Sequence, residues 1–269
     1  MPVTLTLLTD YGLEDDFVGV CHAVIAGIAP DARVVDLSHG IPRHDVRTGA
    51  IVLRRTLPFA PAGVHVAVVD PEVGGRRRAI ALRTAEDDRL LVGPDNGLLL
   101  PAADRFGGVA QAVEISTSPC RLTPVSATFH GRDLFAPVGA HLAAGTAFEE
   151  TGDPLEPAEL VRLDLPTARL EGDEVVAHVL AVDRYGNVTL DAEHTLLARS
   201  GLRLGQAVVV EAAGREHRAV YAHAFTDVAP GELLLYEDAY RTLALAVNRG
   251  SAEEQLRVTL DAELRVLPA

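Results

Sequence analysis

The first half of the chain alternates short apolar runs with segments whose apolar residues recur at helical spacing. The runs at residues 3–9 and 64–69 predict buried strands, and shorter strands are expected at 33–35, 79–83 and 89–92. Because strands and helices alternate here, we predict an α/β domain with a mostly parallel sheet.

Three helices are predicted in the same half. Apolar residues are spaced by three and four over residues 17–28, and residues 45–57 also look helical up to the helix-breaking Pro58. Residues 133–144 form the third candidate, despite Pro137 in its first turns.

The pattern changes in the second half to short strands punctuated by Gly and Asn. This pattern predicts a small antiparallel barrel or sandwich. We therefore expect an α/β domain over residues 1–165 and an all-β domain over residues 173–269. The expected strands are 175–182, 188–190, 207–211, 217–222, 233–236, 243–247, 256–260 and 263–267.

Composition narrows the classes of partner. The chain has 38 acidic and 24 basic residues, a formal net charge of −14, and an ordinary globular content of 48% hydrophobic residues. A phosphate backbone would repel such a protein, so no nucleic-acid partner is expected. A cationic or zwitterionic small molecule suits it better, although solubility is the commoner reason for such a charge.

Several features predict a cytoplasmic protein without a membrane partner. The N-terminus has no basic start and soon reaches Asp10, so we expect no signal peptide. No run of 18 or more apolar residues predicts a membrane span. Cys21 and Cys120 are the two cysteines and do not suggest a disulfide framework.

Acidic residues follow several predicted strands, namely Asp10, Asp36, Asp70 and later Asp183. Ligands of open α/β sheets bind beyond the carboxyl ends of the strands. Acids there can hold a ribose diol, an ammonium group or a metal ion. The alternative is that each Asp starts a turn or caps the next helix.

Two further residues stand near such ends. In VVDPEVGGRRRAI, Pro71 and the glycine pair let the chain fold back, so Arg77 can reach Asp70 and keep it ionised. His130, in TFHGRDLFAP, can lie at a cleft edge and work near neutral pH. A solvated basic stretch and an ordinary loop histidine remain the alternatives. No sequence neighbours suggest a role for His22, His39, His44 or His65.

Six ordered motifs together are more specific: LLTDYG, VVDPEVGGRRRAI, GPDNGLL, TFHGRDLFAP, VDRYGNV and LALAVNRGSA. Over essentially its whole length the chain resembles the S-adenosyl-L-methionine (SAM) hydroxide adenosyltransferases, relatives of the fluorinase and chlorinase enzymes. The resemblance implies hydrolysis of SAM to adenosine and methionine, without a metal or cofactor. It also implies an α/β domain followed by a β-barrel, and a homotrimer with active sites between subunits.

The resemblance further implies roles for individual residues. Asp70, Arg77 and His130 match the set that handles the attacking water. The implied substrate-binding residues are Asp10 for the ribose hydroxyls, Asp183 for the methionine ammonium group, and Asn187 and Phe225 around the adenine.

Position 70 separates the hydrolases from the halogenating relatives, which carry Tyr there. Asp70 would repel a halide and hold water instead. The chain departs from the family pattern at Glu72, where Gly is usual, and at Tyr240 and Arg241, where Ser or Phe and then Gly are usual. We therefore assign no residue to the methionine carboxylate.

Two other function classes are consistent with the residues. In a metal-dependent nucleotidase or phosphatase, Asp10, Asp70 and His130 would be metal ligands, and a chelator would abolish activity. A sensor would bind SAM or adenosine without turnover. The chain lacks a tight H-x-H or D-x-D cluster, and its intact Asp70, Arg77 and His130 set favours the hydrolase.

Overall fold

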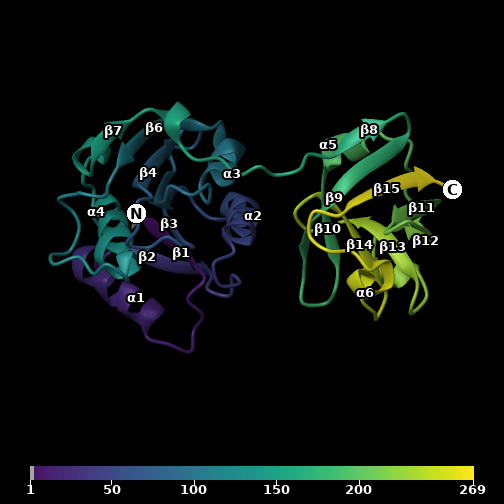
Figure 1. The fold of residues 1–269 in the computed structure, drawn as a ribbon, viewed down its shortest axis with the longest axis horizontal. Coiled ribbons are helices and arrows are strands. Elements are labelled where there is room, and N and C mark those ends of the chain that lie inside the picture. Colours follow the sequence, from purple (N-terminus) through teal and green to yellow (C-terminus); the bar gives the residue numbers. More distant parts are fainter. Residues whose placement is uncertain (1–2) are drawn as a thin grey trace. The chain divides into compact units, whose positions relative to one another are not determined.

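The computed structural model describes residues 3–269. It divides into two units, the first ending at Leu163 and the second covering Asp164–Ala269 (Figure 1). Among the described residues, no helix combines the length and apolar character needed to cross a membrane.

The first unit is built on a seven-stranded sheet in the order β2-β1-β3-β5-β4-β6-β7. Neighbours from β2 to β5 run parallel, and β4, β6 and β7 extend the sheet antiparallel. The predicted α/β class is confirmed. The strands are β1 (Thr4–Thr9), β2 (Arg33–Ser38), β3 (Gly63–Val68), β4 (Ala79–Thr84), β5 (Leu90–Pro94), β6 (Val109–Glu114) and β7 (Asp153–Leu155).

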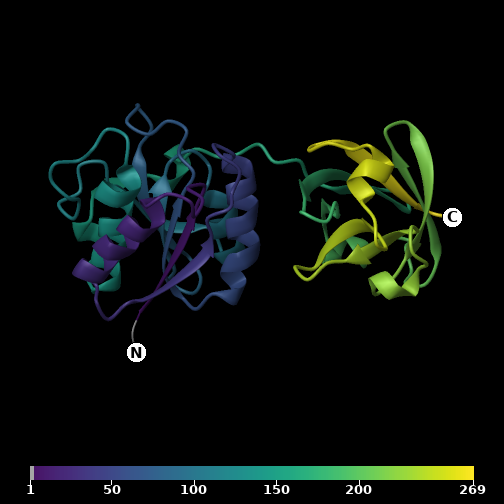
Figure 2. The same ribbon diagram turned by 90° about the horizontal axis from the view of Figure 1, so that it is seen from below.

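Helices cover both faces of this sheet, with α1 and α4 on one side and α2 and α3 on the other (Figures 1 and 2). Alternation along β1 sends Leu7 into the core under α1 and α4, and Leu8 into the core under α2. With both faces covered, the strand ends are left for binding. The helices are α1 (Phe17–Ile28), α2 (Val46–Thr56), α3 (Leu100–Ala103) and α4 (Ala136–Ala143).

Shorter helical turns complete this unit. A π-helical turn at Gly131–Phe135 leads into α4, where one continuous helix was expected. Single 3₁₀ turns occur at Leu57–Phe59, Asp104–Phe106, Phe148–Glu150 and Pro157–Glu159.

The second unit is a closed β-barrel, as predicted. Seven strands follow one another in the order β10-β14-β13-β12-β11-β15-β9, and pairing of β9 with β10 closes the ring. β8 pairs with β9 outside the ring, and β12 and β13 form a parallel pair. The strands are β8 (Arg169–Glu171), β9 (Glu174–Val182), β10 (Val188–Glu193), β11 (Ala207–Ala212), β12 (Arg215–Tyr221), β13 (Leu233–Glu237), β14 (Thr242–Val247) and β15 (Glu263–Pro268).

The expected strand at 256–260 is wrong. Ser251 instead caps the short helix α6 (Ala252–Leu256), accepting a hydrogen bond of 3.2 Å from the Glu254 amide. Leu256 and Val258 fill the barrel core from the helix end and the following turn, which explains their apolar character. The unit also has α5 (His194–Leu197) and a 3₁₀ turn at Phe225–Asp227.

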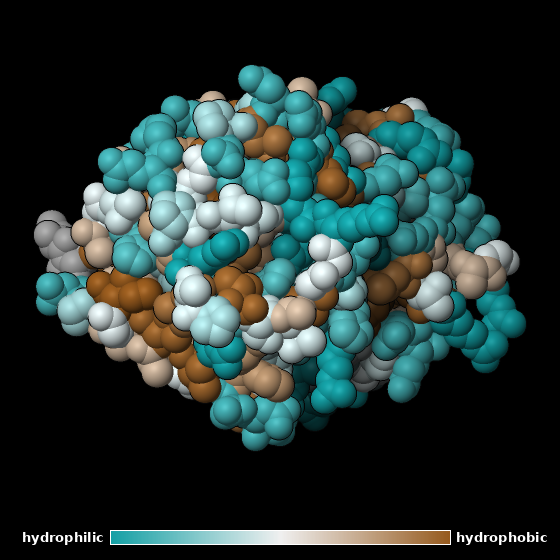
Figure 3. Space-filling model, turned by 60° about the vertical axis from the view of Figure 1, so that its left-hand side comes forward, coloured by the Kyte–Doolittle hydropathy of each residue, from teal (hydrophilic) through white to brown (hydrophobic). Residues whose placement is uncertain are grey.

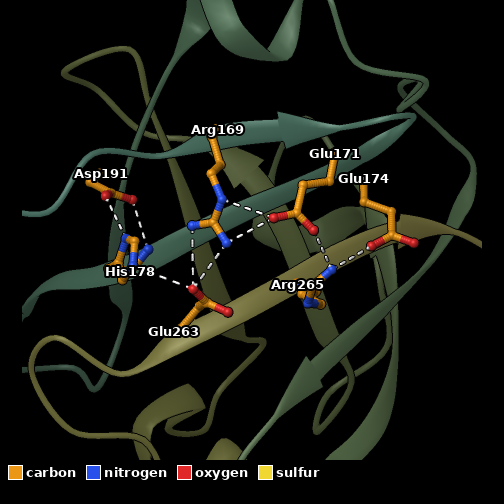
Figure 4. A network of polar contacts seen from close by, with 7 residues as sticks. All are labelled: Arg169, Glu171, Glu174, His178, Asp191, Glu263 and Arg265. Carbon is orange, nitrogen blue, oxygen red and sulfur yellow. Dashed lines mark hydrogen bonds and ion pairs between the residues drawn. The ribbon is translucent and has the colours of Figure 1, made fainter.

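Charged side chains link β8, β9, β10 and β15 on the barrel (Figure 4). Arg169 pairs with Glu171 and Glu263, and Arg265 pairs with Glu171 and Glu174. Such exposed pairs each add little stability. Hydrophilic residues also cover much of the face drawn in Figure 3.

His65 is the one fully buried histidine among the described residues. Its Nδ1 lies 2.9 Å from Thr6 Oγ1, and Arg89 donates to its Nε2 at 3.3 Å. Burial, reinforced by the Arg89 charge, lowers the pKa of His65 to about 3. The imidazole therefore stays neutral in the folded protein at moderately acidic pH.

This buried imidazole predicts a loss of stability in acid. Below its ordinary pKa of 6.5, His65 takes up a proton in the unfolded chain but not in the folded one, so the free energy of unfolding falls as the pH falls. Between pH 7 and pH 5 we expect this group to cost about 2 kcal/mol. Urea unfolding at both pH values measures the loss, which His65→Gln should remove. An equal loss in both proteins would contradict the assignment.

Candidate active site

A cavity of about 390 Å³ opens at the carboxyl ends of β1 and β3. Asp10 follows β1, Asp70 follows β3, and His130 directly precedes the π-helical turn; all three line this cavity. Three predicted site residues that are far apart in the sequence are thus brought together. Further lining residues include Tyr11, Phe17, Arg43, His44, Thr128 and Phe129.

Arg77 joins Asp70 to His130. Its Nε donates to both Asp70 carboxylate oxygens, at 2.9 and 3.0 Å, and its Nη2 also contacts Oδ2. The same Nη2 donates to His130 Nδ1 at 2.8 Å. The side chains of Asp70 and Arg77 are each only 5% exposed, so the ion pair is shielded from solvent.

The loop between Asp70 and Arg77 makes this pairing possible. Gly74 has a φ of +75°, and a Cβ there would lie 2.1 Å from the Ala127 carbonyl oxygen. Only glycine fits both the left-handed conformation and this close approach. The loop can therefore pack against the segment that leads to His130.

The contact with Arg77 sets the tautomer of His130. A guanidinium group only donates hydrogen bonds, so Nδ1 must accept and the ring proton lies on Nε2. Burial and then the Arg77 charge lower the pKa of His130, outweighing the opposite effects of Asp70 and Asp133. The structure therefore favours a neutral imidazole beside the cavity.

Asp10 is held by backbone. The His44 amide donates to Asp10 Oδ2 at 2.9 Å, and His44 has a left-handed φ of +66° that is uncommon for residues other than glycine. In this conformation the His44 N–H group points at the Asp10 carboxylate and fixes its orientation at the carboxyl end of β1.

Sequence reasoning missed an aromatic wall and the role of Gly131. Tyr11, Phe17 and Phe129 meet edge to face with centroids 5.2–5.9 Å apart. Burial, with smaller effects from Cys21, Asp10 and Asp70, raises the pKa of Tyr11, so its hydroxyl stays neutral. A Cβ at Gly131 would lie 2.2 Å from that hydroxyl. The position of Tyr11 directly after Asp10 was the available signal.

Two predicted substrate-binding residues share one turn of the barrel unit. Asp183 Oδ1 accepts the backbone amides of Tyr185 and Asn187, and its Oδ2 accepts Asn187 Nδ2 at 2.8 Å. Asp183 thus starts a turn, which the sequence analysis gave as the alternative to a binding role. The two carboxylate oxygens have about four acceptor positions, so one remains.

Phe225 lies in the same barrel unit. Its ring packs against Tyr236 with a centroid separation of 5.2 Å, and it is 43% exposed. Burial and then the nearby charges of Asp183 and Asp238 raise the pKa of Tyr236 to about 12. Tyr236 therefore packs against Phe225 and lies near enough to Asp183 for that carboxylate to raise the pKa of its hydroxyl.

The cavity does not favour a metal centre. Within residues 3–269, the only three candidate metal-ligand atoms that lie within 4.8 Å of one another belong to His22, Asp36 and His39. In the cavity the cationic Arg77 already binds both oxygens of Asp70 and the Nδ1 of His130. These contacts disfavour the nucleotidase arrangement.

Comparison with known proteins identifies the family. Residues 5–152 match the SAM hydroxide adenosyltransferase N-terminal domain, and residues 177–265 match the C-terminal domain of the same family. The chain therefore belongs to the SAM hydroxide adenosyltransferase family, as its motifs predicted.

Individual relatives support this membership. The chain is 50% identical over 262 residues to the (R)-S-adenosyl-L-methionine hydrolase of Salinispora tropica, covering 97% of both chains. It is 28% identical to the fluorinase of Nocardia brasiliensis over 75% of each chain. An uncharacterized conserved protein from Thermotoga maritima has a similar crystal structure, with a TM-score of 0.92, 37% identity, and coverage of 98% of this chain and 99% of that one.

The contacts around His130 predict how its titration responds to substitution. In the unmodified protein its pKa should lie below the ordinary 6.5. Asp70→Asn removes a charge that raises this pKa and should lower it further, whereas Arg77→Gln should raise it. NMR titration of the His130 ring measures all three values. A shift of the same sign in both variants would contradict the arrangement.

Proposed function

We propose that this protein hydrolyses SAM to adenosine and L-methionine by attack of water on the ribose 5′ carbon. The observation that carries the proposal is Asp70, held in the cavity wall by Arg77 next to a neutral His130. A close relative supports the same reaction, since the similar Salinispora tropica protein is an (R)-S-adenosyl-L-methionine hydrolase.

The reaction balances without a metal or cofactor. The water oxygen forms a bond to C5′ as the bond from C5′ to the sulfonium breaks, and sulfur keeps the electron pair as a neutral thioether. One proton is released from the water, with the Asp70 carboxylate as its nearest proposed acceptor before it passes to solvent. Because the sulfonium is already a good leaving group, alignment is the main task, and it can supply roughly 7–11 kcal/mol.

Asp70 suits water better than a halide. Its carboxylate would repel fluoride or chloride but can orient a water molecule by accepting its hydrogen. Arg77 lies behind the carboxylate and compensates its charge, so the water side of Asp70 remains available to the cavity. We place Asp70 beside the water and away from the sulfonium, where a fixed anion would stabilise the ground state and slow the reaction.

The remaining roles follow the family motifs. Asp10 is proposed to accept hydrogen bonds from the ribose hydroxyls, which its fixed orientation toward the cavity supports. Asp183 is proposed to bind the methionine ammonium group with its remaining acceptor position. Asn187 and Phe225 are proposed to contact the adenine, since Asn187 keeps free amide hydrogen-bonding capacity and the Phe225 ring is partly exposed.

Substitution of Asp70 tests the proposal. Asp70→Asn should reduce turnover of SAM by about 10²–10⁴-fold because the water loses its acceptor, while the affinity for SAM changes little. Chromatography of adenosine and methionine measures turnover, and calorimetry measures binding.

Asp95→Asn provides a matched control. The Asp95 side chain is 2% exposed, close to the 5% of Asp70, and it pairs with an arginine, Arg78, at 2.9 Å, but it does not line the cavity. Its variant should keep its turnover. Equal losses in the two variants would indicate general destabilisation, and full activity of Asp70→Asn would remove Asp70 from the mechanism.

We also propose that the enzyme is a homotrimer whose active sites combine residues of neighbouring subunits. The family resemblance supports this, as does the division of the proposed residues between the two units. Light scattering at working concentration should give three times the chain mass of 28.5 kDa. A monomer mass under turnover conditions would contradict the shared site.

A further inference from the structure

Two histidines and an aspartate converge at the β2 edge of the first unit, outside the catalytic cavity. His22 lies on α1, Asp36 on β2, and His39 directly after β2. Asp36 Oδ1 is 2.9 Å from His22 Nε2 and 3.1 Å from His39 Nε2. All three potential ligand atoms lie within 4.8 Å of one another.

His39 is the buried member of this cluster, and a contact at its other ring nitrogen fixes its orientation. The residue is only 6% exposed, and its buried Nε2 faces Asp36 without a well-aligned hydrogen bond in the described part of the chain. Its other nitrogen, Nδ1, lies 2.8 Å from Thr9 Oγ1. When Nδ1 donates its proton to Thr9, Nε2 presents its lone pair to the cluster, which is how a metal-binding histidine is usually oriented.

We propose that His22, Asp36 and His39 bind a divalent transition-metal ion, with Zn²⁺ as the best fit. Two imidazoles and a carboxylate are typical zinc ligands. Tetrahedral bonds of about 2.0–2.1 Å place ligand atoms roughly 3.3 Å apart. The observed separations of 2.9 and 3.1 Å are slightly shorter, so small outward movements admit the ion.

The surroundings fit a three-ligand site with one position for water. The side chains of His22 and Asp36 are 37% and 40% exposed, so the ion has a route from solvent.

The ion would stabilise the loop that carries two cavity residues. The carbonyl of His39 accepts the Gly12 amide at 2.9 Å, and Thr9 Oγ1 accepts the Tyr11 amide at 3.2 Å. Fixing His39 thus fixes both sides of the segment containing Asp10 and Tyr11. The role is structural, because the proposed hydrolysis does not involve this ion.

Titration of the untagged, chelator-treated full-length protein tests the proposal. Co²⁺, a spectroscopic substitute for Zn²⁺, should bind at one equivalent per chain with visible absorption bands, and Zn²⁺ should displace it. Zn²⁺ should also raise the midpoint of thermal unfolding, since it binds the folded state. His22→Ala and Asp36→Asn should each weaken binding by about tenfold or more.

His178→Ala is a matched control. Like His22, His178 contacts carboxylate groups. Its two ring nitrogens face different ones, however: Nδ1 contacts Asp191 and Nε2 points to Glu263 (Figure 4). No common metal position results, so the variant should bind Co²⁺ as the unmodified protein does. Equal binding by His22→Ala and the unmodified protein, or loss only in His178→Ala, would overturn the proposal.

Discussion

The guanidinium group of Arg77 is positively charged and only donates hydrogen bonds. The organisation of the cavity depends on both properties. It holds Asp70 through Nε and Nη2, and it also donates to His130. Because Arg77 cannot accept a hydrogen bond, the Nδ1 of His130 must be the acceptor, and the hydrogen of the neutral ring lies on Nε2. One cation therefore compensates the carboxylate, sets the tautomer and fixes the distance between two candidate catalytic side chains.

The fold makes this arrangement possible through its parallel strands and two glycines. β1 and β3 are paired in register and end at the same edge of the sheet, which brings Asp10 and Asp70 to one cavity. Gly74 lets the loop approach the segment before His130, and Gly131 leaves room for the Tyr11 hydroxyl. A side chain at Gly74 would collide with Ala127, and one at Gly131 would collide with Tyr11. The packing around the cavity therefore requires glycine at both positions.

Periodicity predicted most elements because apolar spacing reflects local geometry. It failed at 256–260, where apolar residues fill the barrel core from a helix end, and it missed β6 and β7 at the antiparallel side of the sheet. The family motifs suggested Asp70, Arg77 and His130 as site residues, and the loop after Asp70 predicted that Arg77 could reach it, but nothing predicted that Arg77 also donates to His130. The contact between Tyr11 and Gly131, and the convergence of His22 with His39, depend on segments distant in sequence and have no local signature.

The central claim is that water attacks the ribose carbon of SAM in the cavity organised by Asp70. Mass spectrometry of the products formed in ¹⁸O-labelled water tests it most directly. The account predicts adenosine that carries one ¹⁸O at its 5′ oxygen, together with unlabelled methionine. Unlabelled adenosine, or binding of SAM without release of adenosine, would contradict it.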